Sequence, residues 1–430
     1  MTKADLLITN IGQLVTCAAY GRPKRALAMR DVGIIEKAAV AIIDGMIAAA
    51  GSEDEITGSF NTTEMIDAGG HSVCPAFVDP HTHIVFAGDR LDEFELKIKG
   101  AEYLEILKSG GGIISTVRKT REASEEELID AALGRLDKML ACGTGTAEIK
   151  TGYGLDTETE MKMLRVIEAL DEQHPIRVVP TFLGAHALPP EFKDDPDGYV
   201  DLICEEMLPK AWEWYQGSRF RVAGTPFFVD VFCERNAFSL EQARRVLEYG
   251  KKLGFEIKAH VDQFSNLGGS DLAIAADAVS IDHLDAISDA EIERLAKSDT
   301  IGVVIPTENF AGGKTKFADA RRMIDAGCAV AITTDYNPGS APCPSQQMAM
   351  AIACRYQKLM PAEVFNAATI NAAYAVGLGK ERGSIEAGKS ADLLILDTTD
   401  YREAVYEFGG NLVRRAILSG SIVDRGRMQN

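Results

Sequence analysis

The chain has 430 residues, 46% of them hydrophobic, and a formal net charge of −19 at pH 7. Such a chain can bury a large core, whereas its acidity argues against nucleic acid or an anionic membrane as a partner. An anionic substrate would therefore have to be bound by a local cation. No basic segment followed by an apolar one opens the sequence, so we expect no secretory signal. The most apolar stretch, AAVAIIDGMIAAAG, is interrupted by Asp44 and is too short to span a bilayer.

The cysteines indicate a reducing compartment. None of the eight forms a CxxC pair, and several lie inside apolar runs. This pattern is typical of buried, reduced thiols and not of a disulfide framework. We therefore expect a cytoplasmic enzyme.

Both ends of the chain have the character of β-structure. The N-terminal residues, up to about position 70, alternate short apolar segments with turns and show no helical period of useful length. The last part resumes this pattern in GSIEAGKSADLLILD and RRAILSGSIVDRG. We predict that residues 1–75 and 384–430 together build a small β-sandwich, into which residues 76–383 are inserted.

The inserted region alternates apolar strands with charged helical stretches such as SEEELIDAALGRLDKMLACG and SLEQARRVLEYGKKLG, the second of which is stopped by glycine. Eight near-continuous apolar strands with helical crossovers predict an α/β fold of the (β/α)8, TIM-like barrel type. The strand segments are SVCPAFVDPHTH, GTGTAEIKTG, RVVPTFLGAH, PFFVDVFCE, FEIKAHVD, AVSIDHL, IGVVIPT and AVAITTD.

Polar residues gather at the C-terminal ends of these strands, where (β/α)8 enzymes carry their chemistry. His81 and His83 are alternate residues, so both can face the barrel axis. An HxH pair alone more often represents two polar core residues, but His260 and Asp335 end two further strands. Three imidazoles and a carboxylate predict a divalent-metal site with an open position for water. The strand-end residues are His81 and His83 on strand one, His186 on three, His260 on five, His283 on six and Asp335 on eight.

These positions, together with a sandwich made from both termini, resemble the amidohydrolase superfamily. Within it, the motifs are similar to those of the histidine-degradation hydrolases that open a cyclic amide. The motifs, in chain order, are PAFVDPHTHIVFAGDR, GGGIISTVRKTR, KTGYGL, TFLGAHALPPE, VDVFCE, HVDQFSNLGG, SIDHL and TTDYNPGSAPCPSQQMAM. The resemblance implies hydrolysis of 4-imidazolone-5-propanoate, a small anionic substrate, to N-formimino-L-glutamate by a homodimer.

The resemblance also assigns roles to residues. It implies one zinc or iron ion per chain, held by His81, His83, His260 and Asp335. Asp335 can accept a proton from the attacking water and return it to the ring nitrogen. His283 can polarise the carbonyl or share in proton transfer. Contacts to substrate or product are implied for Arg90, Tyr153, His186, Gln263, Asn337, Gly339 and Ser340.

Two departures from the superfamily's patterns shape this interpretation. Some family members have Glu at the position of Gln263, and an amide cannot act as a base. We therefore expect Gln263 to orient the ring and Asp335 or His283 to be the base. Strand four ends in VDVFCE, without the lysine that bridges two metal ions elsewhere in the superfamily, so we expect one ion. Glu234 either supports the metal ligands or is an ordinary carboxylate at the rim.

The remaining candidates have plainer alternatives. Arg90 can bind a carboxylate through two parallel hydrogen bonds, or it is a surface charge. Tyr153 is otherwise a packed turn residue. The NPGS segment forms a turn that can offer backbone N–H groups to an anion. SGGGIIST at 109–116 lacks the Lys-Ser/Thr of a phosphate-binding loop and is expected to be a mobile loop over the barrel mouth. His71 and His174 are expected to be structural or exposed.

Two other functions fit the same residues. One is a mononuclear-metal aminohydrolase that deaminates a small heterocycle and has no need of a carboxylate-binding arginine. The other is a scaffold without metal that serves as an assembly module, which the intact ligand set disfavours.

Overall fold

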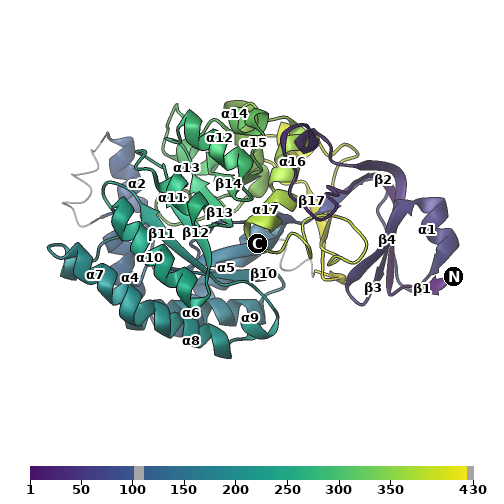
Figure 1. The fold of residues 1–430 in the computed structure, drawn as a ribbon. Coiled ribbons are helices and arrows are strands. Elements are labelled where there is room, and N and C mark those ends of the chain that lie inside the picture. The colour runs from purple at the N-terminus through teal and green to yellow at the C-terminus, as the bar shows by residue number, and fades with distance from the viewer. Residues whose placement is uncertain (101–110, 424–430) are drawn as a thin grey trace.

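The computed structural model describes residues 1–100 and 111–423. Its larger part is a barrel of parallel strands surrounded by helices, and its smaller part is a sheet to which both ends of the chain contribute (Figure 1). The predicted fold, a (β/α)8 barrel with a β-module made from both termini, is thereby confirmed.

Eight parallel strands form the barrel sheet, and each is hydrogen-bonded to its neighbours in chain order. All eight correspond to the predicted segments. They are β8 (Phe77–Asp79), β9 (Thr144–Lys150), β10 (Arg177–Ala185), β11 (Phe228–Cys233), β12 (Glu256–Val261), β13 (Ser280–His283), β14 (Ile301–Val304) and β15 (Val330–Ile332).

Side chains join the first barrel strand to the last. The buried Asp79 carboxylate at the end of β8 accepts hydrogen bonds from the Thr334 backbone N–H, at 3.1 Å, and from the hydroxyls of Thr333 and Thr334. Gln346 Nε2 donates to backbone carbonyls of both strands, at 3.0 and 3.4 Å. The segments that leave β8 and β15 at the barrel mouth are therefore neighbours.

Helices connect the strands and cover the barrel. The α5 helix begins at a capping box of Ser124 and Glu127, and α10 begins at one of Ser239 and Gln242. As predicted, α10 ends at Gly254, whose φ of 115° suits glycine. The helices are α2 (Leu91–Ile98), α4 (Ile113–Glu122), α5 (Glu125–Ala141), α6 (Thr157–Gln173), α7 (Pro196–Leu202), a π-helix (Ile203–Met207), α8 (Leu208–Gly217), α9 (Arg219–Val222), α10 (Leu240–Leu253), α11 (Gly269–Ala275), α12 (Asp289–Lys297), α13 (Pro306–Ala311), α14 (Ala320–Ala326), α15 (Gln346–Tyr356), α16 (Pro361–Ala367), α17 (Ile370–Ala375) and α18 (Glu403–Tyr406), with a short turn at Pro190–Phe192.

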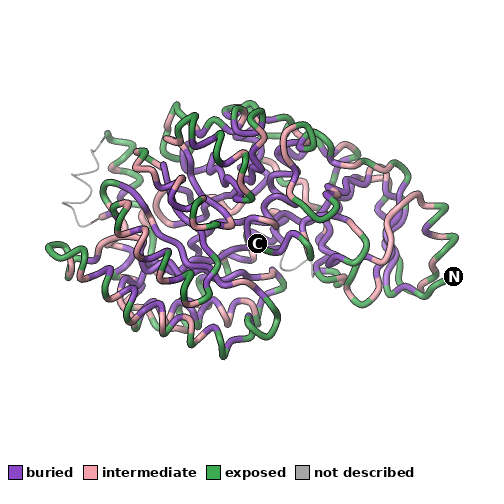
Figure 2. Tube along the Cα trace, in the orientation of Figure 1, coloured by how far each residue is buried: buried purple, intermediate pink, exposed green. Residues whose placement is uncertain are grey.

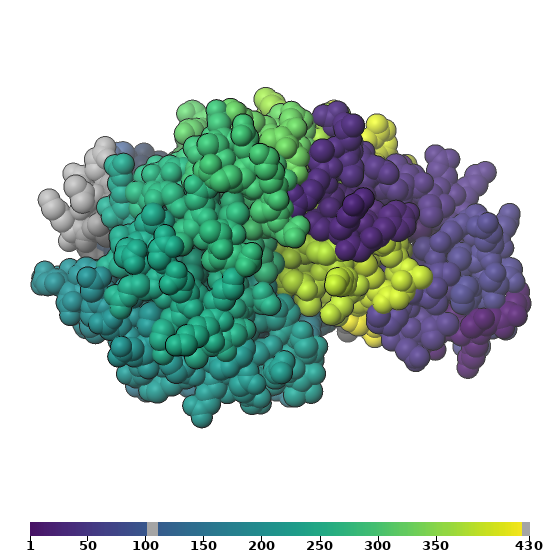
Figure 3. All heavy atoms as spheres, viewed as in Figure 1, coloured from purple at the N-terminus to yellow at the C-terminus, as the bar shows by residue number. Residues whose placement is uncertain are grey.

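The second sheet interleaves the two ends of the chain. Its strand order is β18-β17-β16-β7-β2-β3-β4, with β6 also paired to β2. In the space-filling view the purple N-terminal and yellow C-terminal segments pack together (Figure 3). The strands are β2 (Leu6–Val15), β3 (Ile34–Ile43), β4 (Met46–Ser52), β6 (Met65–Asp67), β7 (Ser72–Pro75), β16 (Leu393–Leu396), β17 (Val413–Leu418) and β18 (Ser421–Ile422), and β1 (Thr2–Lys3) pairs with β5 (Phe60–Asn61) in a small separate sheet.

Three expectations about local structure were wrong. SVCPAFVDPHTH is not one strand, because β7 pairs with β2 and β16 whereas β8, beyond Ala76, pairs with β9. The N-terminal module contains α1 (Glu53–Ser59), capped by Ser52, and a 3-10 turn at Ala26–Arg30, both too short to show a helical period. Within SGGGIIST, residues from 113 onward are the first turn of α4 and not a loop, while 109 and 110 lie outside the described residues.

The residues of the barrel strands are almost all buried, and these strands are almost continuously purple in Figure 2. In the part of the chain that the structure describes, no helix is both long enough and apolar enough to cross a membrane.

Candidate metal centre and active site

The segment that carries His81 and His83 leaves the barrel just beyond β8 and is fixed on two sides. On one side the Lys150 N–H donates to the Thr82 carbonyl at 2.9 Å, and the Thr82 hydroxyl donates to the Glu148 carbonyl at 2.6 Å. On the other side the His83 N–H donates to the Tyr336 carbonyl at 2.9 Å. The HxH segment is therefore held between β9 and the residues that follow β15, and both imidazoles have a defined position.

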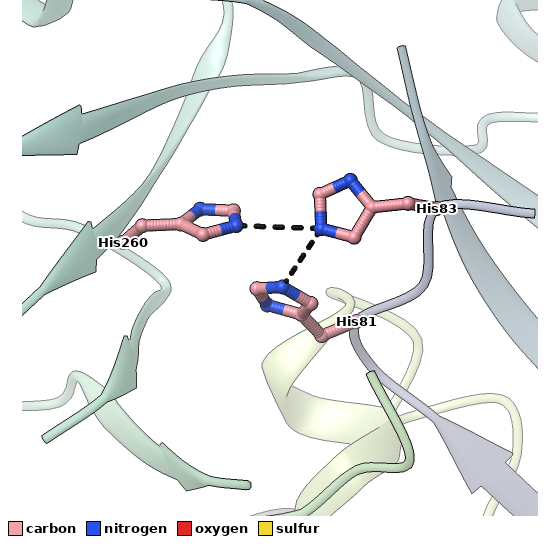
Figure 4. Close-up of side chains that lie close together, drawn as sticks. All are labelled: His81, His83 and His260. Atoms are coloured by element: carbon pink, nitrogen blue, oxygen red, sulfur yellow. Dashed lines mark hydrogen bonds between the residues drawn. The ribbon is translucent and has the colours of Figure 1, made fainter. Parts of the chain in front are cut away.

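His81, His83 and His260 meet at the barrel mouth (Figure 4). His83 Nε2 lies 3.1 Å from His81 Nε2 and 3.4 Å from His260 Nε2. Asp335 Oδ1 lies 3.6 Å from the Nε2 atoms of both His81 and His83. All four side chains are buried. Four donor atoms from three different segments, those after β8 and β15 and the end of β12, thus lie close together.

Burial, aided by Lys150 and the neighbouring histidines, keeps the rings of His81 and His83 neutral. Desolvation, aided by Lys150 and the adjacent histidines, holds the pKa of His81 well below its ordinary range. Desolvation and His186 do the same for the pKa of His83. A neutral imidazole offers a lone pair, which is the form that binds a metal ion. Nitrogen lone pairs facing one another beside a carboxylate therefore fit a single cation.

An ionic layer lies in the barrel beneath these histidines. Glu148 and Lys150 on β9, Asp230 on β11, Lys258 on β12 and Asp282 on β13 are all completely buried. Lys150 Nζ lies 2.7 Å from Glu148 Oε1 and 2.8 Å from Asp230 Oδ2. Although burial opposes the charged form, these carboxylates raise the pKa of Lys150 above its ordinary value. The layer thus pairs three carboxyl groups with two lysines inside the barrel.

The layer also orients two of the histidines. Asp282 Oδ2 is 2.6 Å from His81 Nδ1, and Asp230 Oδ2 is 2.9 Å from His260 Nδ1. The Asp282 carboxylate favours a proton on His81 Nδ1 and leaves its Nε2 free to bind a metal, while Asp230 Oδ1 accepts from the His260 backbone N–H at 3.1 Å. Sequence reasoning missed these residues because it treated their strands as continuously apolar. The signal was the alternation of charged residues with apolar ones in TAEIK, FVDVF and FEIKAHV.

His283 reaches the same cluster through an unusual backbone conformation. It directly follows the inward-facing Asp282, so strict strand alternation would turn it away from the barrel interior. Instead, φ is 85° at His283 and 68° at Leu284, values rare for side-chain-bearing residues. The His283 ring centroid lies 5.5 Å from that of His81 and 5.2 Å from that of His260. Burial keeps the pKa of His283 well below its ordinary value, so the ring is neutral.

Asp335 also has left-handed backbone geometry, with φ of 49°. Burial and the nearby Glu308 raise the pKa of its carboxyl well above the ordinary value, while a hydrogen bond involving Asn337 opposes this. A cation at the histidine cluster would counteract the shift, because an opposite charge favours the ionised form. The proton affinity of Asp335 is thus set by what occupies the mouth.

Arg90 is the N-cap residue of α2 and lies against the turn after Asp335. Its Nε donates to Thr116 Oγ1 at 2.9 Å and lies 3.9 Å from Glu93 Oε1. Among the described residues, neither terminal nitrogen of the guanidinium has a hydrogen-bond acceptor. A Cβ on Gly339 would lie 2.4 Å from Arg90 Nη1, so glycine is required there for this approach. The guanidinium is therefore held in place through Nε, while its two terminal nitrogens have no acceptor among the described residues.

Tyr153 and His186 extend the cluster of rings. His186 stacks on His83 with centroids 4.9 Å apart and planes at 16°, and Tyr153 lies 5.4 Å from His186. His186 Nδ1 is 3.0 Å from the Gly152 carbonyl, an acceptor that favours the proton on Nδ1. Burial and His260 lower the pKa of His186 to about 3, and burial raises the pKa of Tyr153 above its ordinary value. Both groups are therefore neutral near pH 7.

The NPGS turn does not offer backbone N–H groups as expected. Asn337 Oδ1 accepts from the N–H groups of Gly339 and Ser340, both at 2.8 Å. Asn337 Nδ2 in turn donates to the Asp335 carbonyl at 2.7 Å. Asparagine closes this turn on itself, and it thereby fixes the chain directly after Asp335.

Gln263 and Glu234 follow the C-terminal ends of β12 and β11, respectively. Gln263 is half-buried and lies beside Asp262, whose φ of 55° turns the chain away from the strand. Glu234 Oε2 accepts from the backbone N–H groups of Phe264 and Ser265, at 2.9 and 3.0 Å. Glu234 therefore holds the loop after Gln263 in place. This role differs from both sequence-based interpretations, a support for the metal ligands or an ordinary carboxylate at the rim.

Two further expectations were met. As read from the sequence, β11 contains no lysine, and the buried Lys150 and Lys258 are both bound to Glu148. His71 is partly exposed and pairs with Asp397 and Arg414, and His174 is buried beside Asp137, so both lie outside the cluster.

Comparisons with known proteins agree on the family. The amidohydrolase family matches residues 72–423. The imidazolonepropionase of Chloroflexus aggregans is 50% identical over 423 residues, which are 98% of this chain and 99% of that protein. The imidazolonepropionase of Herpetosiphon aurantiacus is 48% identical, with 100% and 99% covered, and that of Bacillus velezensis is 44% identical, with 98% and 97% covered.

Solved structures share the fold at lower identity. An adenosine deaminase from Xanthomonas campestris with bound zinc superposes with a TM-score of 0.74 at 19% identity, covering 99% of this chain and 96% of that one. A guanine deaminase from C. acetobutylicum with bound guanine has a TM-score of 0.70 at 15% identity, with 97% and 99% covered. The barrel, its ring of mouth histidines and the full-length relatives lead to one conclusion: the chain belongs to the amidohydrolase family and, within it, to the imidazolonepropionases.

Proposed function

We propose that this chain opens the lactam ring of 4-imidazolone-5-propanoate with water, giving N-formimino-L-glutamate. The observation that carries the proposal is the convergence of His81, His83 and His260 at the barrel mouth, in a chain whose full-length relatives bear the imidazolonepropionase name. A deaminase is the weaker alternative, because the deaminases among the solved structures share only the fold.

One zinc or iron ion is proposed to be held by His81, His83, His260 and Asp335. When bound, such an ion supplies a nucleophilic oxygen at neutral pH by lowering the pKa of water from 15.7 to about 7. Support comes from the neutral rings of His81 and His83, from the carboxylates Asp230 and Asp282 behind two of the three rings, and from the absence of a lysine in β11. Nitrogen and carboxylate donors suit both metals.

Asp335 is proposed as the proton carrier. Its Oδ1 faces His81 and His83, and Asn337 fixes the backbone directly behind it. From there the carboxylate accepts a proton from the attacking water and delivers it to the leaving ring nitrogen. The neutral His283 polarises the lactam carbonyl by hydrogen bonding, and Gln263 orients the ring, since an amide cannot take up the proton.

Arg90 is proposed to bind the propionate, with Tyr153, His186, Asn337, Gly339 and Ser340 shaping the pocket around the substrate. The support is its free guanidinium fork, held in place through Nε by Thr116. Gly339 has no side chain that would displace the terminal nitrogens of the guanidinium. Asn337 and Ser340 hold the turn that contains Gly339 in its conformation. The chain is further proposed to act as a cytoplasmic homodimer, in keeping with eight free cysteines.

The reaction is tested with freshly prepared imidazolone propionate. We expect the absorbance of the ring to fall far faster than in the enzyme-free control and N-formimino-L-glutamate to form in equal amount, without ammonia. No acceleration over the enzyme-free control would refute the proposal, and release of ammonia from an amino-substituted heterocycle would then support the deaminase.

Arg90→Ala is expected to lower kcat/KM roughly ten- to several hundred-fold. A charge-assisted hydrogen bond contributes about 1.5–3 kcal/mol, and 1.4 kcal/mol corresponds to about tenfold. Arg90→Lys should recover only part of the loss, since an ammonium cannot reproduce the two-pronged contact. Steady-state kinetics on the propionate substrate check this, with metal content expected to stay normal.

Arg118→Ala is the control, because Arg118 is exposed on α4 and its loss removes the same charge. If the Arg90→Ala and Arg118→Ala enzymes had equal kcat/KM, the propionate would be bound elsewhere.

A further inference from the structure

A second group of potential metal ligands lies at the barrel mouth, beside the three-histidine cluster. It consists of His283 at the end of β13, Asp285 two residues later and Glu308 on α13. One ring nitrogen and one oxygen of each carboxylate all lie within 4.8 Å of one another. His283 Nδ1 and Glu308 Oε2 are 3.9 Å apart, too far for a hydrogen bond. His283 packs against the rings of the first cluster but is not one of its proposed metal ligands, and neither are Asp285 and Glu308.

Each carboxylate in this group has one oxygen held by a protein donor. Lys314 Nζ donates to Glu308 Oε1 at 2.7 Å, and Asn309 Nδ2 donates to Asp285 Oδ1. Each carboxylate thereby keeps one oxygen without a protein donor, and Glu308 Oε2 is the oxygen that lies 3.9 Å from His283 Nδ1. This arrangement is that of a prepared site, because the orienting bonds leave a converging set of acceptors free.

The converging atoms are buried and unsatisfied. His283 Nδ1, Asp285 Oδ2 and Glu308 Oε2 have no hydrogen-bond partner among the described residues. The exposed fractions of His283 and Glu308 are only 3% and 4%. A buried polar atom without a partner is costly, and most such atoms in folded proteins bind a protein group, water or an ion. Three of them at one place indicate a ligand.

The charges and donor types select the ligand. Asp285 and Glu308 bring two carboxyl groups to the site against the single basic group of Lys314. Burial raises the pKa of Asp285 to about 7, and a bound cation would favour its ionised form. One imidazole nitrogen with two carboxylate oxygens suits a first-row divalent ion, whereas magnesium and calcium prefer oxygen alone. We propose that His283 Nδ1, Asp285 Oδ2 and Glu308 Oε2 form a second site for a divalent transition-metal ion such as zinc.

This site binds more weakly than the first. Ligand atoms about 2.0–2.2 Å from a tetrahedral zinc lie roughly 3.5 Å from one another. The nitrogens of the first cluster, at 3.1 and 3.4 Å, already have this spacing, whereas the donors of the second spread over as much as 4.8 Å. The second group must contract to bind, and part of the binding energy is lost in doing so.

Occupation of the second site affects the reaction if the function proposed above is correct. An ion on Nδ1 would hold the His283 ring in place and keep its one proton on Nε2, so the ring could no longer turn or change tautomer to follow the lactam carbonyl. Added zinc beyond the first equivalent is therefore expected to slow ring opening.

Equilibrium dialysis of the enzyme with its first ion in place, against increasing zinc, tests the site directly. We expect one further zinc ion per chain in the native protein. Asp285→Asn and Glu308→Gln should each retain the first ion and bind the second at least tenfold more weakly. Asp271→Asn is the control, because it removes one carboxylate charge from a partly exposed ion pair with Arg294 on a neighbouring surface; it should bind both ions.

Anomalous scattering from zinc-soaked crystals of the native protein provides a measurement that does not depend on the variants. A second peak between His283, Asp285 and Glu308 is expected. Absence of a second equivalent in the native protein, or unchanged binding in both variants, would overturn the proposal. Because the first ion and the turnover with one ion are measured separately, that result would leave the proposed hydrolysis intact.

Discussion

Asp335→Asn is expected to lose nearly all turnover, at least about a thousandfold, whereas Gln263→Ala keeps a measurable part of it. General acid–base groups contribute about 10²–10⁴-fold, and Asp335 is in addition a proposed metal ligand. Asparagine has nearly the shape of aspartate but cannot accept the proton. Gln263 only positions the ring, so its loss should cost about ten- to a hundredfold at most.

The measurement is kcat at saturating substrate for both variants, expressed per bound metal ion. This normalisation separates the loss of a base from the loss of a ligand. A Gln263→Ala enzyme slower than the Asp335→Asn enzyme would refute the proton-carrier assignment and would give the amide a role that its chemistry does not suggest.

His260→Ala is expected to lose the metal ion and the activity together. Removing a residue that only orients a metal ligand lowers affinity by about 10–100-fold, so removing a ligand itself should exceed that. The variant also leaves His83 Nε2 without the neighbour that lies 3.4 Å away. Elemental analysis after dialysis, followed by the ring-opening assay, checks both losses in one preparation.

His71→Ala is the matched control. His71 contacts Asp397 and Arg414 in the terminal β-module, and its loss should leave metal content and turnover unchanged. Circular dichroism should show that both variants are folded. If His260→Ala retained a full equivalent of the first ion, the proposed ligand set would be wrong.

The barrel could be predicted because its strands are mostly apolar in sequence, whereas the helices between them are rich in charged residues. Segments such as IGVVIPT and AVAITTD are apolar on both faces, as expected of parallel strands covered by helices. Once eight such strands are recognised, their C-terminal ends must meet at one mouth, and the proximity of His81, His83 and His260 follows. The same reasoning led to the module made from both chain ends, because their short apolar segments cannot be buried independently.

What sequence reasoning missed depends on contacts between distant strands. Glu148, Lys150 and Asp230 looked like isolated charges in apolar strands, yet they compensate one another inside the barrel. The division at Ala76 was invisible because β7 and β8 have the same apolar character and differ only in their partners.

Local backbone geometry accounts for the other omissions. The left-handed conformation of His283 brings its ring to the mouth, and a histidine at the end of an apolar strand does not by itself predict positive φ. Asn337 closes the NPGS turn with its own side chain, so the N–H groups of Gly339 and Ser340 are not available to an anion. Both features depend on hydrogen bonds and dihedral angles that a residue pattern alone does not specify.

The rate of imidazolone propionate ring opening, measured while metal-free protein is titrated with zinc or iron, tests the central claim most directly. The rate should be near zero without metal, rise in proportion to bound ion and reach its maximum at one ion per chain. An equal rate in the metal-free protein, or a maximum only at two ions per chain, would contradict a single ion at His81, His83, His260 and Asp335 as the centre of catalysis.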